Sequence, residues 1–240
     1  MKTCYYCGAE ANNKEHLPPK QLFKGFHVDS LTAYSCENHN NMKSFDDEAI
    51  VKSMLFALEK DNIIKNDDIK LAIDIIRQSH HQVKNKVSEN TLYKQNCIDY
   101  NFIVLNPDVD LSNWIKKLSA GLIWYKTKFF DHDNKFDDSF VFERNSYPKH
   151  DTTSDLTFFE KEYNNKIELT SIIEANDWIN GWNDKKNIYP ATIYAFYYKF
   201  INKYIMIKHI FYQQFTFYNF INLSEKTLLK IKSNSSKIVR

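Results

Sequence analysis

The sequence predicts an α+β protein with an N-terminal unit stabilised by zinc, a set of central helices and a C-terminal antiparallel β-meander. Three observations carry this prediction. Two pairs of metal-binding side chains lie near the N-terminus, apolar residues recur at helical spacing through the middle, and aromatic-rich segments with short polar breaks fill the last third. We place the domain boundaries at residues 1–62, 63–222 and 223–240, of which the last is a basic tail.

Cysteine and histidine spacing predicts the zinc site. Two residues separate Cys4 from Cys7, and two separate Cys36 from His39. Such spacing lets a tight turn, or the first turn of a helix, aim both side chains at one ion, and zinc prefers four N or S ligands in a tetrahedron. The 28 residues between the pairs suit a hairpin inserted between turn and helix. The alternative is that the cysteines are buried thiols and the histidine lies on the surface by coincidence, which would leave this region without a metal to offset its small local core. The fourth cysteine, Cys97, is expected to be a core thiol.

Helical periodicity organises the middle of the chain. An acidic stretch at 131–138 resembles a calcium loop, but Phe136 and Phe142 replace the Gly and Glu that such a loop needs, so we expect a surface loop. The pair His80-His81 is expected on a solvated helix face. The expected elements are a strand at 31–35, a helix from about Asn40, a second helix capped by Asp67 and Asp68, and a third from Asp110 to about Lys126.

The C-terminal third changes to strand-like segments rich in Ile, Tyr and Phe. After it, the tail carries five basic residues against Glu225 alone, and both a frayed helix and a disordered end stay open for it. The expected strands are 166–173, 191–200, 203–211 and 215–221, of which the last three form the meander.

Composition narrows the class of protein. The chain has 32 basic and 30 acidic residues, so a nucleic-acid contact has to come from a local basic patch. No window approaches 18 consecutive apolar residues, and no apolar segment of a secretory signal follows Met1. We therefore expect no membrane association and a cytoplasmic location.

A second set of polar residues flanks the zinc pairs. Glu15 and His16 fall on the expected hairpin, and Asn40 falls on the first turn of the expected helix. Carboxylate and amide oxygens suit Mg²⁺ or Mn²⁺, and a neutral histidine can take a proton from water near pH 7. These are the parts needed for metal-assisted phosphodiester hydrolysis. The alternatives are a hairpin salt bridge or surface histidine for Glu15 and His16, and a helix-start amide for Asn40.

The motifs C-Y-Y-C, E-H-L-P-P and C-E-N-H-N-N-M-K-S, within residues 4–48, resemble the HNH endonucleases. The resemblance is to the branch whose ββα-metal unit is built on a treble-clef zinc site. It implies His16 as general base, Glu15 and Asn40 as ligands of catalytic Mg²⁺ or Mn²⁺, and Lys43 as a phosphate contact. It also implies structural Zn²⁺ on Cys4, Cys7, Cys36 and His39.

The chain departs from the family pattern at two points. His39 stands where the fourth zinc ligand is usually Cys, which zinc tolerates. The middle Asn of the motif is not evident, and Asp29 or Ser30 occupies roughly that stretch. The missing Asn leaves a second reading open, a non-catalytic zinc-binding module for nucleic acid or protein.

The resemblance also implies partners. It points to nucleic acid, with DNA as the expected substrate, and more weakly to bacterial proteins of phage defence. The C-terminal region is then a surface for a protein partner, and a homodimer stays open because nuclease sites that nick one strand often act in pairs.

Overall fold

The computed structural model describes residues 2–29, 31–60, 66–80, 111–127, 135–144, 177–181, 189–201 and 204–235. In chain order its elements are β1 (Asn13–His16), η1 (Lys20–Phe23), β2 (Thr32–Ser35), α1 (Glu37–Lys60), α2 (Asp67–His80), α3 (Leu111–Thr127), β3 (Lys135–Arg144), β4 (Ile179–Asn180), β5 (Tyr194–Ile201), β6 (Tyr204–Phe211), β7 (Phe215–Asn222) and α6 (Glu225–Ser235).

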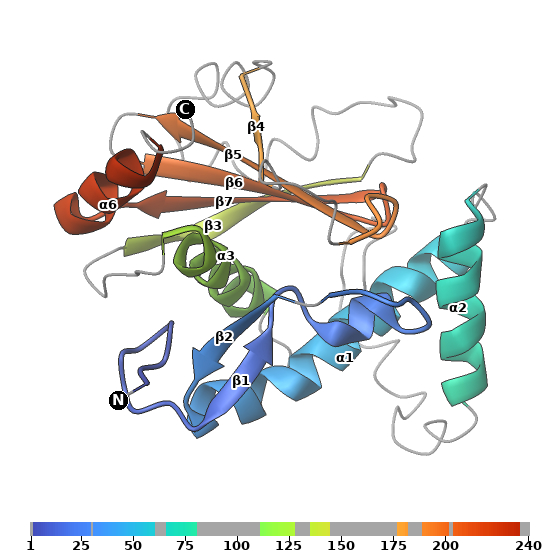
Figure 1. Ribbon diagram of the computed structural model, residues 1–240. Coiled ribbons are helices and arrows are strands. Elements are labelled where there is room, and N and C mark those ends of the chain that lie inside the picture. The colour runs from blue at the N-terminus through green and yellow to red at the C-terminus, as the bar shows by residue number, and fades with distance from the viewer. Residues whose placement is uncertain are drawn as a thin grey trace.

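The helix α3 lies between the C-terminal sheet and the N-terminal hairpin (Figure 1). On one side it contacts β3 and β7 of the sheet, and on the other it contacts β2 and α1. A segment from the middle of the chain therefore covers the N-terminal unit.

The N-terminal unit is a β-hairpin followed by a long helix, as the sequence predicts. β1 and β2 pair antiparallel, with Glu15 opposite Ala33 and His16 opposite Thr32. The helix expected from about Asn40 begins at Glu37 instead, because the Asn40 N–H already donates a helical hydrogen bond to the Cys36 carbonyl (3.0 Å).

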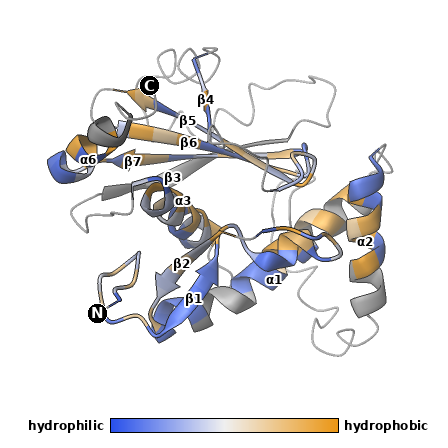
Figure 2. Cartoon of the chain, viewed as in Figure 1, coloured by the Kyte–Doolittle hydropathy of each residue, from blue (hydrophilic) through white to orange (hydrophobic). Residues whose placement is uncertain are grey.

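The predicted meander is confirmed. β5, β6 and β7 pair antiparallel in sequence order, and the described sheet has the order β3-β7-β6-β5-β4. Between β6 and β7, Tyr212 (φ 53°) and Gln213 (φ 56°) are both left-handed, and the Gln214 N–H donates to the Phe211 carbonyl (3.0 Å). This turn matches the twist of its strands. Figure 2 shows the three strands as largely hydrophobic and β1 as largely hydrophilic.

The prediction of a surface loop at 131–138 is wrong for residues 135–138. The structure places Lys135 to Asp138 in β3, which pairs with β7, and Phe136 lies opposite Ile221. Acidic composition predicts a loop, but β3 lies at the edge of the described sheet, where charged residues are tolerated and the backbone still bonds to one neighbour. Residues 131–134 lie outside the described residues.

The start of the tail is helical. α6 begins after Ser224, whose Oγ accepts a hydrogen bond from the Thr227 N–H (3.2 Å), a typical N-cap. Two alternatives are open for the tail in the sequence, a frayed helix and a disordered end. The structure shows a helix at residues 225–235. Three other expectations lie outside the described residues: the strand at 166–173, the core position of Cys97 and the placement of His81.

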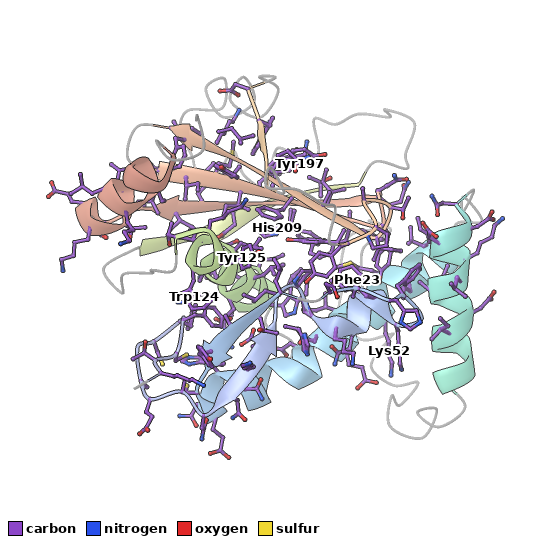
Figure 3. All side chains as sticks on the ribbon, in the orientation of Figure 1. Phe23, Lys52, Trp124, Tyr125, Tyr197 and His209 are labelled. Atoms are coloured by element: carbon purple, nitrogen blue, oxygen red, sulfur yellow. The ribbon has the colours of Figure 1, made fainter. Side chains whose placement is uncertain are left out.

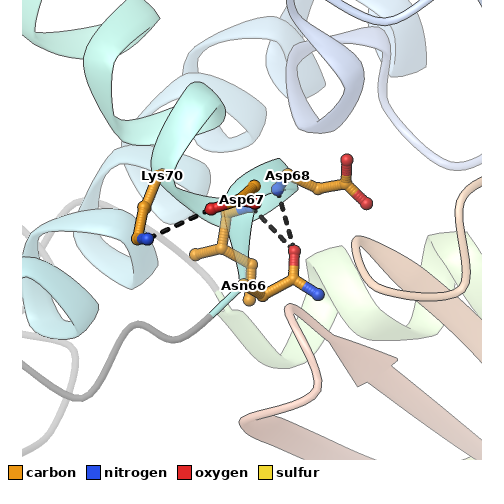
Figure 4. A network of polar contacts seen from close by, with 5 residues as sticks. Asn66, Asp67, Asp68 and Lys70 are labelled. Carbon is orange, nitrogen blue, oxygen red and sulfur yellow. Dashed lines mark hydrogen bonds and ion pairs between the residues drawn. The ribbon is translucent and has the colours of Figure 1, made fainter.

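The helix α2 has its cap one residue earlier than expected. Asn66 Oδ1 accepts hydrogen bonds from the N–H groups of Asp68 (2.8 Å) and Ile69 (3.4 Å), whereas Asp67 pairs with Lys70 (3.1 Å; Figure 4). The Asp68 carboxylate accepts a hydrogen bond from the Thr192 hydroxyl (2.6 Å). This bond connects α2 to the residues before β5.

One hydrophobic core joins these elements. Its buried side chains come from the hairpin, α1, α2, α3 and the sheet, and run in sequence from Tyr5 to Leu223. The division at 62/63 and 222/223 stays a prediction. Within the described ranges, none of the helices is long and apolar enough to cross a membrane.

A buried polar network connects α3 to the sheet. His209 of β6 is fully buried, and Figure 3 shows it between the sheet and α3. Its Nε2 lies 2.8 Å from Ser119 Oγ and its Nδ1 lies 3.0 Å from the Tyr194 hydroxyl. A neutral imidazole offers one donor and one acceptor, and either hydroxyl can complement it. Burial lowers the pKa of His209 to about 3, so the ring is neutral at physiological pH.

This network makes stability depend on pH. Because the folded pKa of His209 lies below the unfolded value near 6.5, its contribution is full above pH 6.5 and is lost as the pH falls. We expect His209→Gln to be less stable than the wild type at pH 7.5. The difference should shrink by about 2 kcal/mol at pH 5, since one proton corresponds to about 1.4 kcal/mol per pH unit.

Urea unfolding at the two pH values measures this difference. His27→Gln is the matched control because His27 is exposed and lies outside the network. A His209→Gln difference that stays constant between pH 7.5 and pH 5 would contradict the prediction.

Candidate metal centre

The four side chains that the spacing selects lie together in the structure. Their ligand atoms are all within 4.8 Å of one another. The separations are 3.7 Å for Cys7 Sγ to Cys36 Sγ, 3.1 Å for Cys36 Sγ to His39 Nδ1, and 3.7 Å for Cys4 Sγ to His39 Nδ1. Zn–S bonds of about 2.3 Å and Zn–N bonds of about 2.0 Å place tetrahedral ligand atoms about 3.5 to 3.8 Å apart. The cluster therefore has the size and donor set of a zinc site.

A tight turn forms the first half of the centre. The Gly8 N–H donates to the Cys4 carbonyl (3.0 Å), and Gly8 adopts a positive φ of 72°, which a glycine takes without strain. The Cys4 N–H donates to the Ala9 carbonyl (2.8 Å), and the Tyr5 N–H donates to the Tyr34 carbonyl (2.8 Å). The last bond attaches the turn to β2, which leads directly into Cys36.

The start of α1 forms the second half. Cys36 precedes α1, and His39 lies in its first turn, so both side chains leave the same end of the helix. The His39 ring packs edge-on against Tyr6 with a centroid distance of 4.9 Å. Tyr6 in turn donates a hydrogen bond to Asn113 Oδ1 of α3 (3.5 Å). The centre is thus held between the turn, α1 and α3.

The electrostatic environment suits a metal ligand set. Burial raises the pKa of Cys4, but backbone N–H groups of Cys36, Cys7 and Tyr6 outweigh it, and the net pKa lies below the usual 9.0. Burial and the neighbouring thiols raise the pKa of Cys7 to about 11, so a metal ion has to displace its proton at neutral pH. Burial lowers the pKa of His39, and the positive charge of Lys117 lowers it further. The negative charge of Glu15 raises it, but the net pKa stays below the usual 6.5. The imidazole is therefore neutral, as a ligand must be.

The three predicted catalytic residues flank this centre. Glu15 is only 4% exposed, and its Oε1 accepts a hydrogen bond from the Tyr5 hydroxyl (3.0 Å). His16 follows it at the end of β1 and is half-buried. Asn40 is half-buried in α1 beside His39. The predicted phosphate contact, Lys43, lies in α1, and its side chain is outside the description.

Among the described residues, Glu15 belongs to no group of three or more Cys, His, Asp or Glu side chains that could share a metal ion, and its pairing with Asn40 stays a prediction. Among the described Cys, His, Asp and Glu side chains, the Cys4, Cys7, Cys36 and His39 group is the one in which three or more could share a metal. The arrangement as it stands is a closed four-ligand centre, which is typical of a structural rather than a catalytic zinc site.

Sequence reasoning missed three buried polar residues around the centre: Tyr5, Asp47 and Lys117. Asp47 is 8% exposed and accepts a hydrogen bond from Trp114 Nε1 of α3 (2.6 Å). Lys117 is 2% exposed on α3. A signal for Lys117 is present in the sequence, because this lysine lies three residues after Trp114 and four before Gly121, both of which are buried on α3.

Zinc removal should unfold the N-terminal unit. Replacing Cys36 leaves three ligands, and zinc binding contributes directly to the folding energy of such units. We expect wild-type protein to carry one zinc ion per chain and Cys36→Ala to lose it, together with the hairpin and the start of α1. Metal analysis and circular dichroism measure both effects. Cys97→Ala is the matched control, and a soluble Cys36→Ala protein with unchanged zinc content would contradict the assignment.

Comparison with known proteins adds no family to this description. No protein-family model matches the sequence, and neither a curated protein nor a solved structure matches it. What the chain shows by itself is a mixed helix-and-strand protein with an N-terminal Cys3His cluster that could hold zinc.

Proposed function

We propose that the protein is a metal-dependent endonuclease of the HNH type that hydrolyses phosphodiester bonds, with DNA as the expected substrate. One observation carries the proposal. The chain order β1, β2, α1 presents Glu15 and His16 on the first strand and Asn40 directly after the fourth ligand of the metal cluster. The ββα-metal arrangement that the HNH resemblance implies requires this order.

In this proposal the chain's residues divide the work. His16 takes a proton from the attacking water, a role that suits an imidazole near neutral pH. Glu15 and Asn40 offer hard oxygen donors to Mg²⁺ or Mn²⁺, which supplies Lewis-acid stabilisation of the developing phosphate charge when bound. The zinc cluster fixes the end of α1, and therefore Asn40, relative to the hairpin that carries His16. The products are a 5′ phosphate and a 3′ hydroxyl.

A specific observation favours the second candidate, a non-catalytic zinc-binding interaction module. Glu15 faces the interior, is almost fully buried and accepts the Tyr5 hydroxyl hydrogen bond. A carboxylate in that environment can serve as a structural acceptor that orders the cysteine turn against the hairpin. Divalent-metal-dependent cleavage separates the two candidates.

The wider proposal concerns partners. The HNH resemblance favours a role in bacterial phage defence, a protein partner bound through the C-terminal sheet, and pairing of two chains for double-strand cleavage. The formal net charge is +2, so DNA binding in this proposal depends on a local patch rather than on overall charge.

Loss of the general base should abolish cleavage without unfolding. We expect wild-type protein to nick supercoiled plasmid with Mg²⁺ or Mn²⁺ and not with EDTA. His16→Ala should reduce nicking by at least about 100-fold, the size typical of a removed general base, with zinc content unchanged. Gel analysis of plasmid forms measures this, and His27→Ala is the control. Nicking by His16→Ala at the wild-type rate would contradict the assignment of His16 as the general base.

Glu15→Gln tests the metal-binding role separately from the structural one. A glutamine keeps an oxygen acceptor for the Tyr5 hydroxyl but removes the carboxylate charge, so the fold should persist while nicking is lost or requires much more Mn²⁺. Tyr5→Phe is the reciprocal control, because it removes the hydrogen bond and keeps the carboxylate. If Tyr5→Phe lowers activity as much as Glu15→Gln does, the structural reading of Glu15 is preferred.

A further inference from the structure

The hydroxyl of Tyr189 lies between the two chain segments that meet at the end of the N-terminal hairpin. It donates a hydrogen bond to the Leu17 carbonyl (3.0 Å) and accepts one from the Leu31 N–H (2.7 Å). Leu17 directly follows His16, the proposed general base. Leu31 directly precedes Thr32, which lies opposite His16 in the hairpin. A side chain from the C-terminal region therefore bonds to the backbone next to His16.

This hydroxyl takes the place of one backbone hydrogen bond in the hairpin. The register that pairs His16 with Thr32 places Leu17 opposite Leu31. Residues of a hydrogen-bonding antiparallel pair exchange two backbone bonds. The bond from the Leu17 N–H to the Leu31 carbonyl is direct (2.9 Å). For the second bond, the Leu31 N–H donates to the Tyr189 hydroxyl, which in turn donates to the Leu17 carbonyl.

His16 depends on this pair for its position. In an antiparallel ladder, pairs that exchange hydrogen bonds alternate with pairs that do not. The pair of Leu17 and Leu31 is of the first kind, so the pair before it, which contains His16, is of the second. The backbone on either side of His16 therefore holds it in place. On one side that backbone belongs to the regular part of β1 and β2, and on the other side it belongs to the pair that Tyr189 completes.

The ring of Tyr189 is fixed by its packing and by the turn that follows it. It is 1% exposed, stacks on Phe23 with a centroid distance of 4.2 Å, and packs edge-on against Tyr194 at 6.4 Å. The Pro190 carbonyl accepts hydrogen bonds from the N–H groups of Ile193 (2.9 Å) and Tyr194 (3.0 Å), which attaches the turn to the start of β5. The hydroxyl is therefore presented to the hairpin from a rigid base.

Removal of the hydroxyl would change the backbone beside His16. Leu17 and Leu31 are both buried, so water has little access to the groups that the hydroxyl joins. Either the two segments close until the Leu31 N–H meets the Leu17 carbonyl directly, or both groups lose a partner. Each outcome moves the residue next to the imidazole. A displacement of about 1 Å can cost on the order of 100-fold in rate when the displaced group takes part in the reaction.

We propose that Tyr189 is a positioning residue for His16, and that the C-terminal region sets the geometry of the nuclease site through this hydroxyl. The inference rests on the proposed function, because it concerns the general base of that reaction. Tyr189 acts through the backbone that flanks His16 and contacts neither the substrate nor the metal. The consequence is a slower chemical step with unchanged substrate binding.

Tyr189→Phe tests the inference, because it removes one oxygen atom and keeps the ring. We expect its kcat for plasmid nicking to fall about 10- to 100-fold, with KM within a few-fold of the wild type and with unchanged zinc content and circular dichroism. Tyr194→Phe is the matched control. It removes a buried hydroxyl that bonds to His209 Nδ1 (3.0 Å) from the neighbouring ring and leaves the hydrogen bonds of the hairpin intact. Its kcat should equal that of the wild type.

A double-mutant cycle separates positioning from a general loss of stability. A positioning role acts only through His16, so Tyr189→Phe should cause no further loss of nicking in a His16→Ala background. A loss that comes from weaker folding predicts instead that the two effects multiply. Long incubations with supercoiled plasmid measure the residual nicking of the His16→Ala proteins.

The position of His16 can also be measured without cleavage. In protein labelled at histidine, we expect the imidazole NMR resonances of His16 to shift or broaden in Tyr189→Phe and to keep their wild-type positions in Tyr194→Phe. His16→Ala identifies these resonances. The Leu31 amide should exchange its hydrogen faster in Tyr189→Phe, because its acceptor is gone. Should Tyr189→Phe fail to fold, a tyrosine fluorinated beside the hydroxyl replaces it at this position in both measurements.

Three results would overturn the inference. The first is an unchanged set of His16 resonances in Tyr189→Phe. The second is an equal loss of kcat in Tyr189→Phe and Tyr194→Phe, and the third is a full further loss in the His16→Ala background. A wild-type chain that nicks no plasmid would contradict the proposed function instead, and the His16 resonances would then decide by themselves whether Tyr189 positions this side chain.

Discussion

The packing of α3 between the C-terminal sheet and the N-terminal hairpin is the constraint on which the rest of the structure depends. Nearly every residue from Trp114 to Ile123 is buried, so most polar groups in this part of α3 cannot face water. Each polar group there has to find a specific environment. Ser119 reaches His209 of the sheet, and the Trp114 indole reaches Asp47 of α1. Polar contacts thus set the orientation of α3 on both of its sides.

The same constraint connects the N-terminal unit to the main core. The hairpin of this unit has four residues in each strand, and its own small cluster has three buried residues, Cys4, Ala11 and Cys36. Leu17 and Leu31 of this unit pack instead into the main core with the sheet residues. Tyr189 draws the two regions together, because its hydroxyl donates to the Leu17 carbonyl (3.0 Å) and accepts from the Leu31 N–H (2.7 Å). The Cys3His cluster that could hold zinc and the long-range packing therefore involve the same hairpin.

Local pattern sufficed for some elements and not for others. The zinc pairs could be recognised because metal ligands need fixed spacing, and the meander because strand and turn chemistry are local. The segment from Lys135 to Asp138 could not, since its acidic composition favours a loop and only pairing with β7 makes it a strand. Lys117 appears in the sequence merely as a charge within an apolar stripe. The environment of Lys117 depends on which element packs on that stripe. Residues close to it in the sequence do not determine that packing.

The burial of Glu15 restricts the chemistry that is proposed for its carboxylate. A carboxylate that serves a phosphodiester-cleaving metal needs an open coordination side, whereas Glu15 is 4% exposed and bonded to Tyr5. α3 contacts both β2 and α1, the elements on either side of that carboxylate. An entering phosphate would therefore approach from the half-buried side that carries His16 and Asn40, or α3 would have to move. Under the proposed function, access to Glu15 would then depend on α3, which also contacts β3 and β7 of the sheet.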